Sequence, residues 1–228
     1  MGFDEPLPAD ADVHRERTLT GKIALVVLVV MIVFVTTSFV TTNWLEGDPK
    51  FYGTKFEKLG LWVHCFRSLP DYNDLKHERF YAGCRWIFNP FTEGYAEIRT
   101  YIVPPFFVAT QFFYTISFVG MLVSAGMILM YLLCIDDYYR VKVLRWIGFD
   151  LIVSAICGTI ALIIFGALGD GRDFMPDWEQ NYLSWSFGLA FVGVFLMYVV
   201  SILFIVEARI IQRKETARES QFPMEKRV

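Results

Sequence analysis

The chain has 228 residues, of which 55% are hydrophobic, 17% aromatic and only 20% charged, with a formal net charge of −3 and a mean hydropathy of +0.42. A soluble domain carries ~25% charged and about 45–50% apolar residues, whereas the apolar excess here lies in four stretches that hold almost no charge. The longest segment left over has 57 residues (43–99), so the composition excludes a soluble globular enzyme and a large catalytic domain on a membrane anchor.

The first two apolar stretches predict two membrane-spanning helices. Residues 23–42 are uncharged, and this run is longer than the ~7–15 apolar residues of a signal peptide, so we predict a retained helix. The second run, 100–135, is too long for one span and too short for two. Because Pro104 and Pro105 remove two backbone donors, the second helix is predicted to begin there and to end near Cys134.

Two further spans follow, and four spans place both termini on the same side. Lys and Arg are denser in the segments on the side of the termini, 12 in 55 residues against 9 in 70, which predicts cytoplasmic termini. The predicted organisation is a cytoplasmic N-terminus 1–21, spans 22–42, 104–135, 147–169 and 183–206, extracellular loops 43–103 and 170–182, a cytoplasmic loop 136–146, and a cytoplasmic tail 207–228 that is disordered beyond Gln212.

The spans themselves are poor in functional groups. The only charged residues in these spans are Lys22 and Asp150, at the cytoplasmic ends of the first and third, which argues against a proton-coupled transporter. Small residues recur at helical spacing on the second and third spans: Ser117, Gly120 and Ser124, and Ser154, Gly158 and Ala161. This spacing allows close helix approach. We expect it to serve packing within one bundle rather than a dimer face.

The long outer loop holds two of the four cysteines, Cys65 and Cys84. In an oxidising compartment they should form a disulfide. Alternation supports a hairpin that brings the two sulfurs together, because two sets of residues each share one face of a predicted strand: Leu59, Leu61, Val63 and Cys65, and Phe80, Ala82, Cys84, Trp86 and Phe88. A zinc site with His64 and His77 is the alternative, although the spacing matches no standard ligand pattern.

Two tryptophans of this loop, Trp44 and Trp62, are large apolar rings near the predicted membrane surface. They are predicted either to anchor the loop at the membrane interface or to fill the space between a sheet and the helix ends.

The loop carries a recognisable signature: Trp44, then Gly60-Leu61-Trp62, Cys65, Cys84, and Arg99 ahead of the second span. This pattern resembles that of the claudin and peripheral-myelin-protein superfamily, and residues 173–176 resemble the claudin turn of the second loop. The chain differs in its eighteen residues between the cysteines and in Met175 in place of a tyrosine. It is therefore similar to a divergent member, such as an invertebrate claudin-like protein of septate junctions.

The resemblance implies an all-α membrane protein, a four-transmembrane-helix bundle with a small disulfide-linked extracellular β-sheet. It also implies association with itself and with other claudin-like or junctional proteins, in cis within one membrane and in trans between two cells. For the trans contact the candidates are Phe174, Met175, Pro176 and Trp178, with membrane-interface packing as the alternative. Arg85, directly after the second loop cysteine, would disfavour cations in a narrow gap.

Other expectations concern the cytoplasmic side. Juxtamembrane Cys134 is a candidate for S-palmitoylation, with an unmodified packed thiol as the alternative. Many claudins end in a PDZ-binding sequence, but Lys226 stands where Ser, Thr or an apolar residue is usual before the terminal Val228, so a PDZ scaffold is a doubtful partner.

No catalytic, cofactor or metal constellation is evident, and we expect no enzymatic activity, no cofactor and no nucleic-acid partner. The predicted function is a barrier protein of septate or tight cell–cell junctions, located at lateral cell borders in the plasma membrane. An auxiliary gamma-type subunit of a channel or receptor is the alternative. A tetraspanin is excluded, because its cysteine-rich loop lies between spans three and four, where this chain has a short segment without cysteine.

Overall fold

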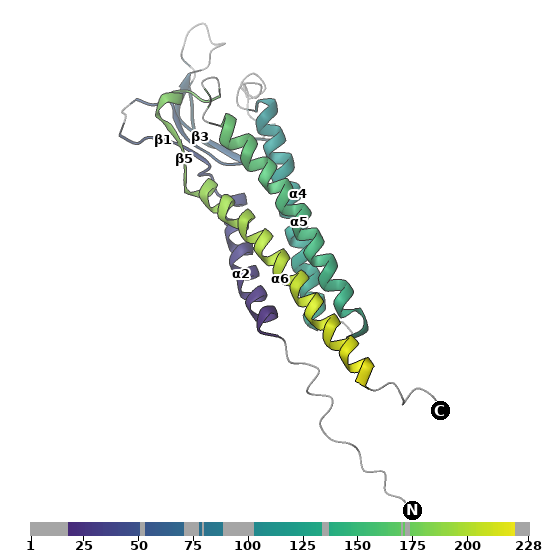
Figure 1. Ribbon diagram of the computed structural model, residues 1–228. Coiled ribbons are helices and arrows are strands. Elements are labelled where there is room, and N and C mark those ends of the chain that lie inside the picture. Colours follow the sequence, from purple (N-terminus) through teal and green to yellow (C-terminus); the bar gives the residue numbers. More distant parts are fainter. Residues whose placement is uncertain are drawn as a thin grey trace, which may run out of the picture.

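Four long helices run side by side and a small sheet covers one end of them (Figure 1). The computed structural model describes residues 18–50, 53–70, 78, 80–88, 103–133, 137–169, 171 and 174–221. The helices are α2 (Leu19–Val40), α4 (Pro105–Leu133), α5 (Asp137–Leu168) and α6 (Trp185–Gln221). Each is long and apolar enough to cross a membrane, which confirms the predicted number of spans. The start of α2 and the end of α6 lie at the end away from the sheet.

The exposed faces of these helices carry apolar side chains, and the buried faces carry small polar side chains as well as apolar ones. On α2, Val26, Val29 and Val33 are exposed although they are apolar, as suits contact with lipid. Several polar side chains are buried between the helices: Ser38, Thr110, Ser117, Ser124, Ser154 and Ser201. In a bilayer the hydrophobic effect does not hold helices together, so small residues and interhelical hydrogen bonds define the contact faces.

The small-residue rows of α4 and α5 face each other inside the bundle. A Cβ added at Gly120 would lie 2.0 Å from Ser154 Oγ, and one added at Gly158 would lie 2.7 Å from a Val194 methyl and 2.8 Å from Ser117 Oγ. Ser124 also donates a hydrogen bond of 2.6 Å to Asp150. These rows pack within one bundle, as predicted, and larger side chains there would separate the helices.

The sheet has five antiparallel strands in the order β4-β3-β2-β1-β5. They are β1 (Leu45–Gly47), β2 (Phe56–Leu59), β3 (Val63–Pro70), β4 (Phe80–Trp86) and β5 (Asn181–Leu183). Both outer segments contribute, because β5 follows α5 and pairs with β1. One expectation is wrong: residues 59–65 do not form a single strand, since the chain turns at residues 60–62 between β2 and β3.

Two helices are longer than their predicted spans. Residues 136–146 were expected to be a loop, but α5 begins at Asp137 and includes most of them. The tail was expected to be disordered beyond Gln212, but α6 continues to Gln221. The reason is local in both cases, because neither segment contains a Gly or Pro that would end a helix. Span prediction from hydropathy cannot detect such extensions beyond the apolar core.

Candidate interaction site on the disulfide-linked sheet

Trp44 packs between the sheet and the ends of three helices. Its side chain is completely buried, and its ring lies edge-on to those of Tyr114 on α4, Phe165 on α5 and Phe187 on α6, with centroids 5.0, 5.1 and 5.6 Å away. Its indole nitrogen donates to the carbonyl of Ser38 at 2.8 Å. Trp44 therefore fills the space between the sheet and the helix ends, and the alternative of a lipid-facing anchor is wrong for this residue.

The backbone of Trp44 also joins the two outer segments. Its amide donates to the carbonyl of Leu59 at 2.8 Å, and its own carbonyl accepts from the amide of Ser184 at 3.0 Å. Ser184 in turn donates from its hydroxyl to Glu46 at 2.6 Å. The first and second outer segments are thus bound into one sheet at the point where the chain leaves α2.

The signature Gly60-Leu61-Trp62 forms the turn that seats this sheet on the helices. A Cβ at Gly60 would lie 2.5 Å from the carbonyl oxygen of Thr41, so only glycine allows this approach of two backbones. Leu61 is fully buried and its carbonyl accepts from the side chain of Gln111 on α4. Trp62 is half-buried against the core, in agreement with its predicted filling role, and its predicted role as a membrane-interface anchor stays a prediction.

Sequence reasoning missed the polar groups that line this junction. Tyr114 donates from its hydroxyl to Ser38 at 3.2 Å, and the hydroxyls of Thr41 and Ser186 are 2.7 Å apart. Gln111 and Tyr114 lie in the first turns of α4 and are nearly or completely buried. The available signal was the position of these two polar residues near the outer end of the uncharged run 100–135. Buried polar groups in a membrane helix need partners within the protein, so the two residues indicated contacts with the outer segments.

Cys65 and Cys84 are opposite each other on β3 and β4 and form a disulfide. The pairing confirms the predicted hairpin and contradicts the zinc alternative, because both thiolates are consumed. In the part of the chain that the structure describes, no group of His, Cys, Asp and Glu could hold a metal ion. His77 lies outside the described residues.

His64 and Arg85 are neighbours on the same two strands. They are cross-strand partners, and His64 is almost completely buried. Burial, and then the positive charge of Arg85, lower the pKa of His64 from 6.5 to about 4. The imidazole is therefore neutral at physiological pH, and Arg85 supplies the positive charge at this pair of positions.

Strand β4 is an edge of the sheet and carries exposed apolar side chains. The predicted alternation is confirmed, because Phe80, Ala82, Cys84, Trp86 and Phe88 are all exposed. Phe80 and Trp86 are each 59% exposed and Phe88 is 47% exposed. We call these three the aromatic edge. An exposed sheet edge with large apolar side chains is a typical docking surface for another strand.

The second outer segment lies differently from the expectation. Phe174 and Met175 were candidates for contact with another cell, but their side chains are only 3% and 2% exposed. Phe174 packs against Phe106 and Phe107 at the start of α4, with centroids 4.9 and 5.7 Å away. This candidate role is wrong for both residues, because their apolar side chains fill the space beside the helix ends.

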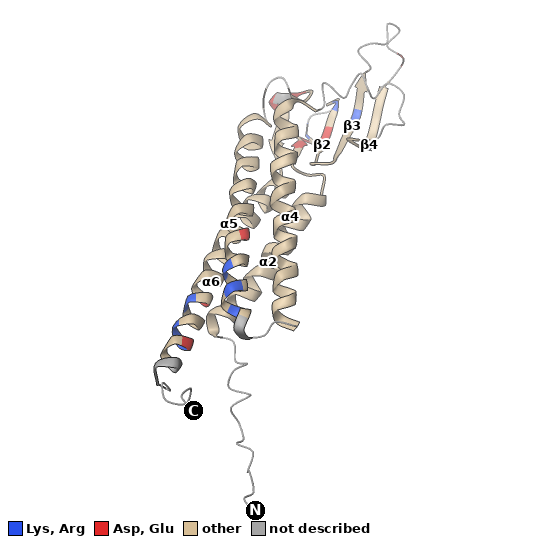
Figure 2. Ribbon diagram, turned by 90° about the vertical axis from the view of Figure 1, so that its right-hand side faces the viewer, with Lys and Arg blue, Asp and Glu red and all other residues tan. Residues whose placement is uncertain are grey.

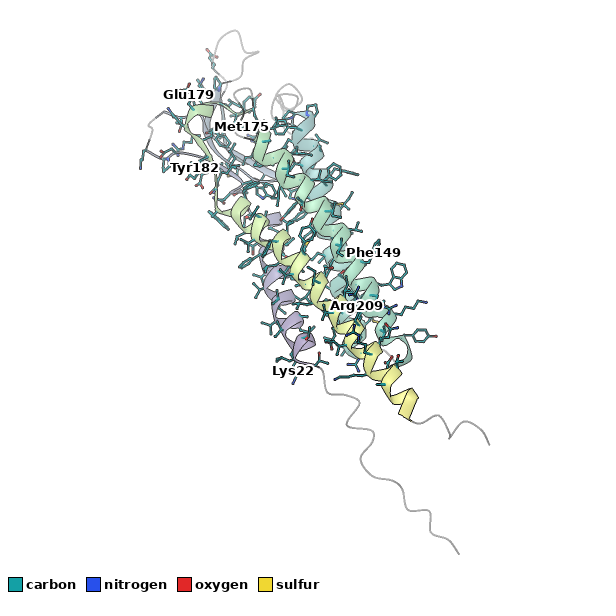
Figure 3. All side chains as sticks on the ribbon, viewed as in Figure 1. Lys22, Phe149, Met175, Glu179, Tyr182 and Arg209 are labelled. Atoms are coloured by element: carbon teal, nitrogen blue, oxygen red, sulfur yellow. A yellow bond between two sulfur atoms is a disulfide. The ribbon has the colours of Figure 1, made fainter. Side chains whose placement is uncertain are left out.

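The rest of that segment is held by hydrogen bonds. Asp177 adopts a positive φ of 59° and its carboxylate accepts from the amide of Lys55 at 2.7 Å, which ties the segment to the residue just before β2. Pro176 is partly exposed and its carbonyl accepts from Asn181 at 3.2 Å. Figure 3 shows Met175, Glu179 and Tyr182 at the sheet end of the molecule and Lys22 and Arg209 at the other.

Some predicted residues are not placed by the structure. Arg99 and Cys134 lie outside the described residues, as does the side chain of Trp178. Cys157 is a half-buried free thiol within α5. The roles predicted for Arg99, Cys134 and Trp178 stay predictions.

The comparisons with known proteins agree with this architecture. The sequence model of the family described as PMP-22/EMP/MP20/Claudin tight junction matches residues 29–206, which include the turn at residues 60–62, the disulfide and most of the four helices. A search of curated proteins finds no match.

Proposed function

The chain belongs to the PMP-22/EMP/MP20/claudin family of four-span, non-enzymatic membrane proteins, and from this premise we propose that it assembles cell–cell junctions and contributes to their paracellular diffusion barrier. The single observation that carries the proposal is the aromatic edge on a sheet that is cross-linked and fixed to the helices. Such a sheet can associate with a second copy or with another junctional membrane protein.

The sheet would face the extracellular space and both ends of the chain the cytoplasm. The disulfide supports this orientation, because disulfides persist in oxidising compartments. The higher density of Lys and Arg in the segments on the side of the termini supports it as well. In this orientation the aromatic edge lies beside the outer surface of the plasma membrane, where neighbouring copies at lateral cell borders could meet in cis.

The sheet is suited to binding another protein because its edge strand β4 is held rigidly. A docking strand must hold its hydrogen-bonding edge and its side chains in one geometry, since ordering them on binding would cost affinity. Here the disulfide ties β4 to β3, and the amide of Ile87 donates to the carbonyl of Trp62 at 2.9 Å. Trp62 lies against Phe39 of α2 with centroids 5.4 Å apart. The edge is therefore connected to the membrane-embedded bundle.

The double substitution Phe80→Ser with Trp86→Ser tests the proposal. In a polarised epithelium depleted of the endogenous protein, we expect this variant to reach the cell surface, to lose enrichment at lateral borders and to leave the epithelium permeable to a tracer dye. Tyr182→Ser is the matched control, because Tyr182 is a 45% exposed aromatic residue on the opposite edge strand β5.

Normal enrichment and a normal barrier with the double variant would contradict the role of the aromatic edge. If depletion of the protein changes channel currents while tracer exclusion stays intact, the protein is an auxiliary gamma-type subunit of a channel or receptor, and the junction proposal fails.

Arg85 would set the ion preference of such a barrier. Its side chain is partly exposed, and its cross-strand partner His64 is neutral at physiological pH, so Arg85 alone supplies the positive charge at this pair of positions. A fixed cation in a narrow aqueous gap repels other cations. Arg85→Glu should therefore shift dilution potentials toward cation permeation, with Arg67→Glu on β3 as the control. An unchanged potential would refute this role of Arg85.

A further inference from the structure

Exposed basic residues gather on α5 and α6 at the end of the bundle away from the sheet, where the ribbon of Figure 2 is blue. On α5 they are Lys142 and Arg145, and on α6 Arg209, Arg213 and Lys214. Arg140 is partly buried and donates to the hydroxyl of Tyr131 at 2.8 Å. The two groups are far apart in the sequence and are brought together because α5 and α6 pack along each other.

The exposed face of α5 changes character at the level of this cluster. Going toward the sheet, Lys142 and Arg145 are followed by Trp146 and Phe149, which are 58% and 59% exposed, and then by the exposed aliphatic Val153. This order of basic, aromatic and aliphatic side chains is typical of a helix leaving the hydrocarbon region at an interface. The membrane boundary therefore lies near Trp146.

Helix α6 shows the same change. Its exposed Ile202 and Val206 are apolar, whereas Arg209 and Arg213 follow on the same side one and two turns later and are exposed. The helix continues to Gln221 without a break. Arg209 and Arg213 are four residues apart, so their side chains project from one face, directly below the apolar part of the helix.

One side-chain contact joins the two basic segments. Arg145 donates a hydrogen bond to the amide oxygen of Gln212 on α6, and Gln212 lies between Arg209 and Arg213. Because the side chain of Gln212 is neutral, this hydrogen bond does not compensate the positive charge of Arg145. We call Arg145, Arg209 and Arg213 the arginine cluster.

Few acids with described side chains oppose this cluster. Asp150 accepts from Ser124, and the buried Glu207 accepts from Thr18 at the start of α2, so both are directed into the bundle. Glu215 is exposed on the outer part of α6. Asp136 and Asp137 precede the basic residues of α5, and their side chains lie outside the described part of the chain. Lys22 at the start of α2 adds a further exposed cation at this end.

From these observations we infer that the arginine cluster is a binding site for the phosphate-bearing headgroup of an anionic lipid. Three guanidinium groups can form paired hydrogen bonds with phosphate oxygens, which a lysine ammonium cannot match. The cluster lies directly below the membrane boundary at Trp146, where headgroups are present. Basic clusters in this position bind anionic lipids of the cytoplasmic leaflet.

A headgroup with several phosphates should bind most tightly. The purified full-length protein in detergent would be titrated with phosphatidylinositol 4,5-bisphosphate, phosphatidylserine or phosphatidylcholine, and retained lipids counted by native mass spectrometry. We expect retention in that order. Loss of one arginine should weaken binding about fivefold, and the triple variant Arg145→Gln, Arg209→Gln, Arg213→Gln about 100-fold.

Three further measurements keep the inference testable. The triple variant Lys50→Gln, Lys55→Gln, Lys58→Gln removes the same charge from the sheet end and should leave binding unchanged; an equal loss there would overturn the inference. Gln212→Ala keeps every charge but frees Arg145, and should weaken binding by less than the loss of one arginine. Inositol 1,4,5-trisphosphate should compete poorly, because it lacks the acyl chains that hold the headgroup at the boundary.

Two other results would overturn the inference: retention of phosphatidylinositol 4,5-bisphosphate by the arginine triple variant at wild-type level, or binding of soluble inositol trisphosphate as tight as that of the lipid. The single-arginine variants and a thermal unfolding curve for each protein separate loss of the site from loss of the fold. None of these measurements depends on barrier function.

Discussion

The two ends of the bundle are built on different physical principles. At the sheet end, Trp44 is buried among three aromatic rings from three helices, and a disulfide joins β3 to β4. At the other end the helices are linked by single side-chain hydrogen bonds: Thr18 to Glu207, Arg140 to Tyr131 and Arg145 to Gln212. Apolar side chains are buried at both ends, among them Leu144 and Ala208 at the end away from the sheet. Only the sheet end adds an aromatic cluster and a covalent bond, whereas the outermost described contacts at the other end are polar.

Because of this difference, the two ends suit different kinds of binding partner. In the proposed function the sheet end would position a surface for a protein partner, which requires it to be rigid. The opposite end exposes cations to the membrane surface, where the ligand is a mobile headgroup and long flexible side chains suffice. Substitutions should therefore be costly for stability at the sheet end and mild at the other.

The largest expected difference is between two tryptophans. Trp44→Ala should lower the free energy of unfolding by about 3–5 kcal/mol, because it leaves a cavity between three rings and removes the indole hydrogen bond to the carbonyl of Ser38. Trp146→Ala removes the same side chain from an exposed position and should change it by only about 0.5 kcal/mol. Denaturant titration of the detergent-solubilised protein measures both, and similar losses would refute the comparison.

The disulfide should come next. The double variant Cys65→Ser, Cys84→Ser should lose about 3 kcal/mol, as estimated for a loop of this length from the chain-entropy model. Cys157→Ser, which changes a free thiol within α5, is the control and should behave as wild type. The same denaturant titration, run on non-reduced protein, gives the values; equal stability of the double variant would show that the sheet does not depend on its cross-link.

Acidification should weaken the sheet end selectively. The pKa of His64 is lowered to about 4 from an unfolded value of 6.5, so the unfolded chain binds a proton first as the pH falls. This contribution to stability is fully present above pH 6.5 and is lost between pH 6.5 and 4, by up to about 3 kcal/mol.

Unfolding curves collected across that pH range measure the effect. His64→Gln should flatten the pH dependence, and Arg85→Gln should reduce it in part, because the charge of Arg85 is the smaller of the two causes. A His64→Gln profile identical to that of the wild type would show that another group titrates.

The smallest effect is expected at the start of α2. Thr18 caps this helix by accepting from the amide of Gly21 and also donates to the buried Glu207. Thr18→Ala should cost about 1 kcal/mol, well below the loss for Trp44→Ala. Thr20→Ala in the same turn is the control. If Thr18→Ala lowered the free energy of unfolding as much as Trp44→Ala, the two ends would contribute equally to stability.

Much of the candidate site could be predicted from local patterns. The alternation of residues 80–88 correctly grouped the residues that share one face of β4, and the two cysteines were correctly paired. That this apolar face is exposed was not predicted. The contacts of Trp44 could not be predicted, because Tyr114, Phe165 and Phe187 come from three different helices. Nor could the burial of Phe174 and Met175, since a short apolar turn at a membrane surface can pack inward or outward with the same residues.

The number of spans followed from composition because the bilayer allows backbone only with internal hydrogen bonds, so any apolar run of sufficient length must become a helix. The sequence by itself also determined the disulfide hairpin and which residues of β4 share a face. Only the tertiary structure decided which faces of the helices meet, how Gly60 lets two backbones touch, and that Arg145 contacts Gln212, which lies between Arg209 and Arg213 in the sequence. The physical reason is that lipid and protein interior are equally apolar, so hydrophobicity alone does not distinguish a packed face from a lipid-facing one.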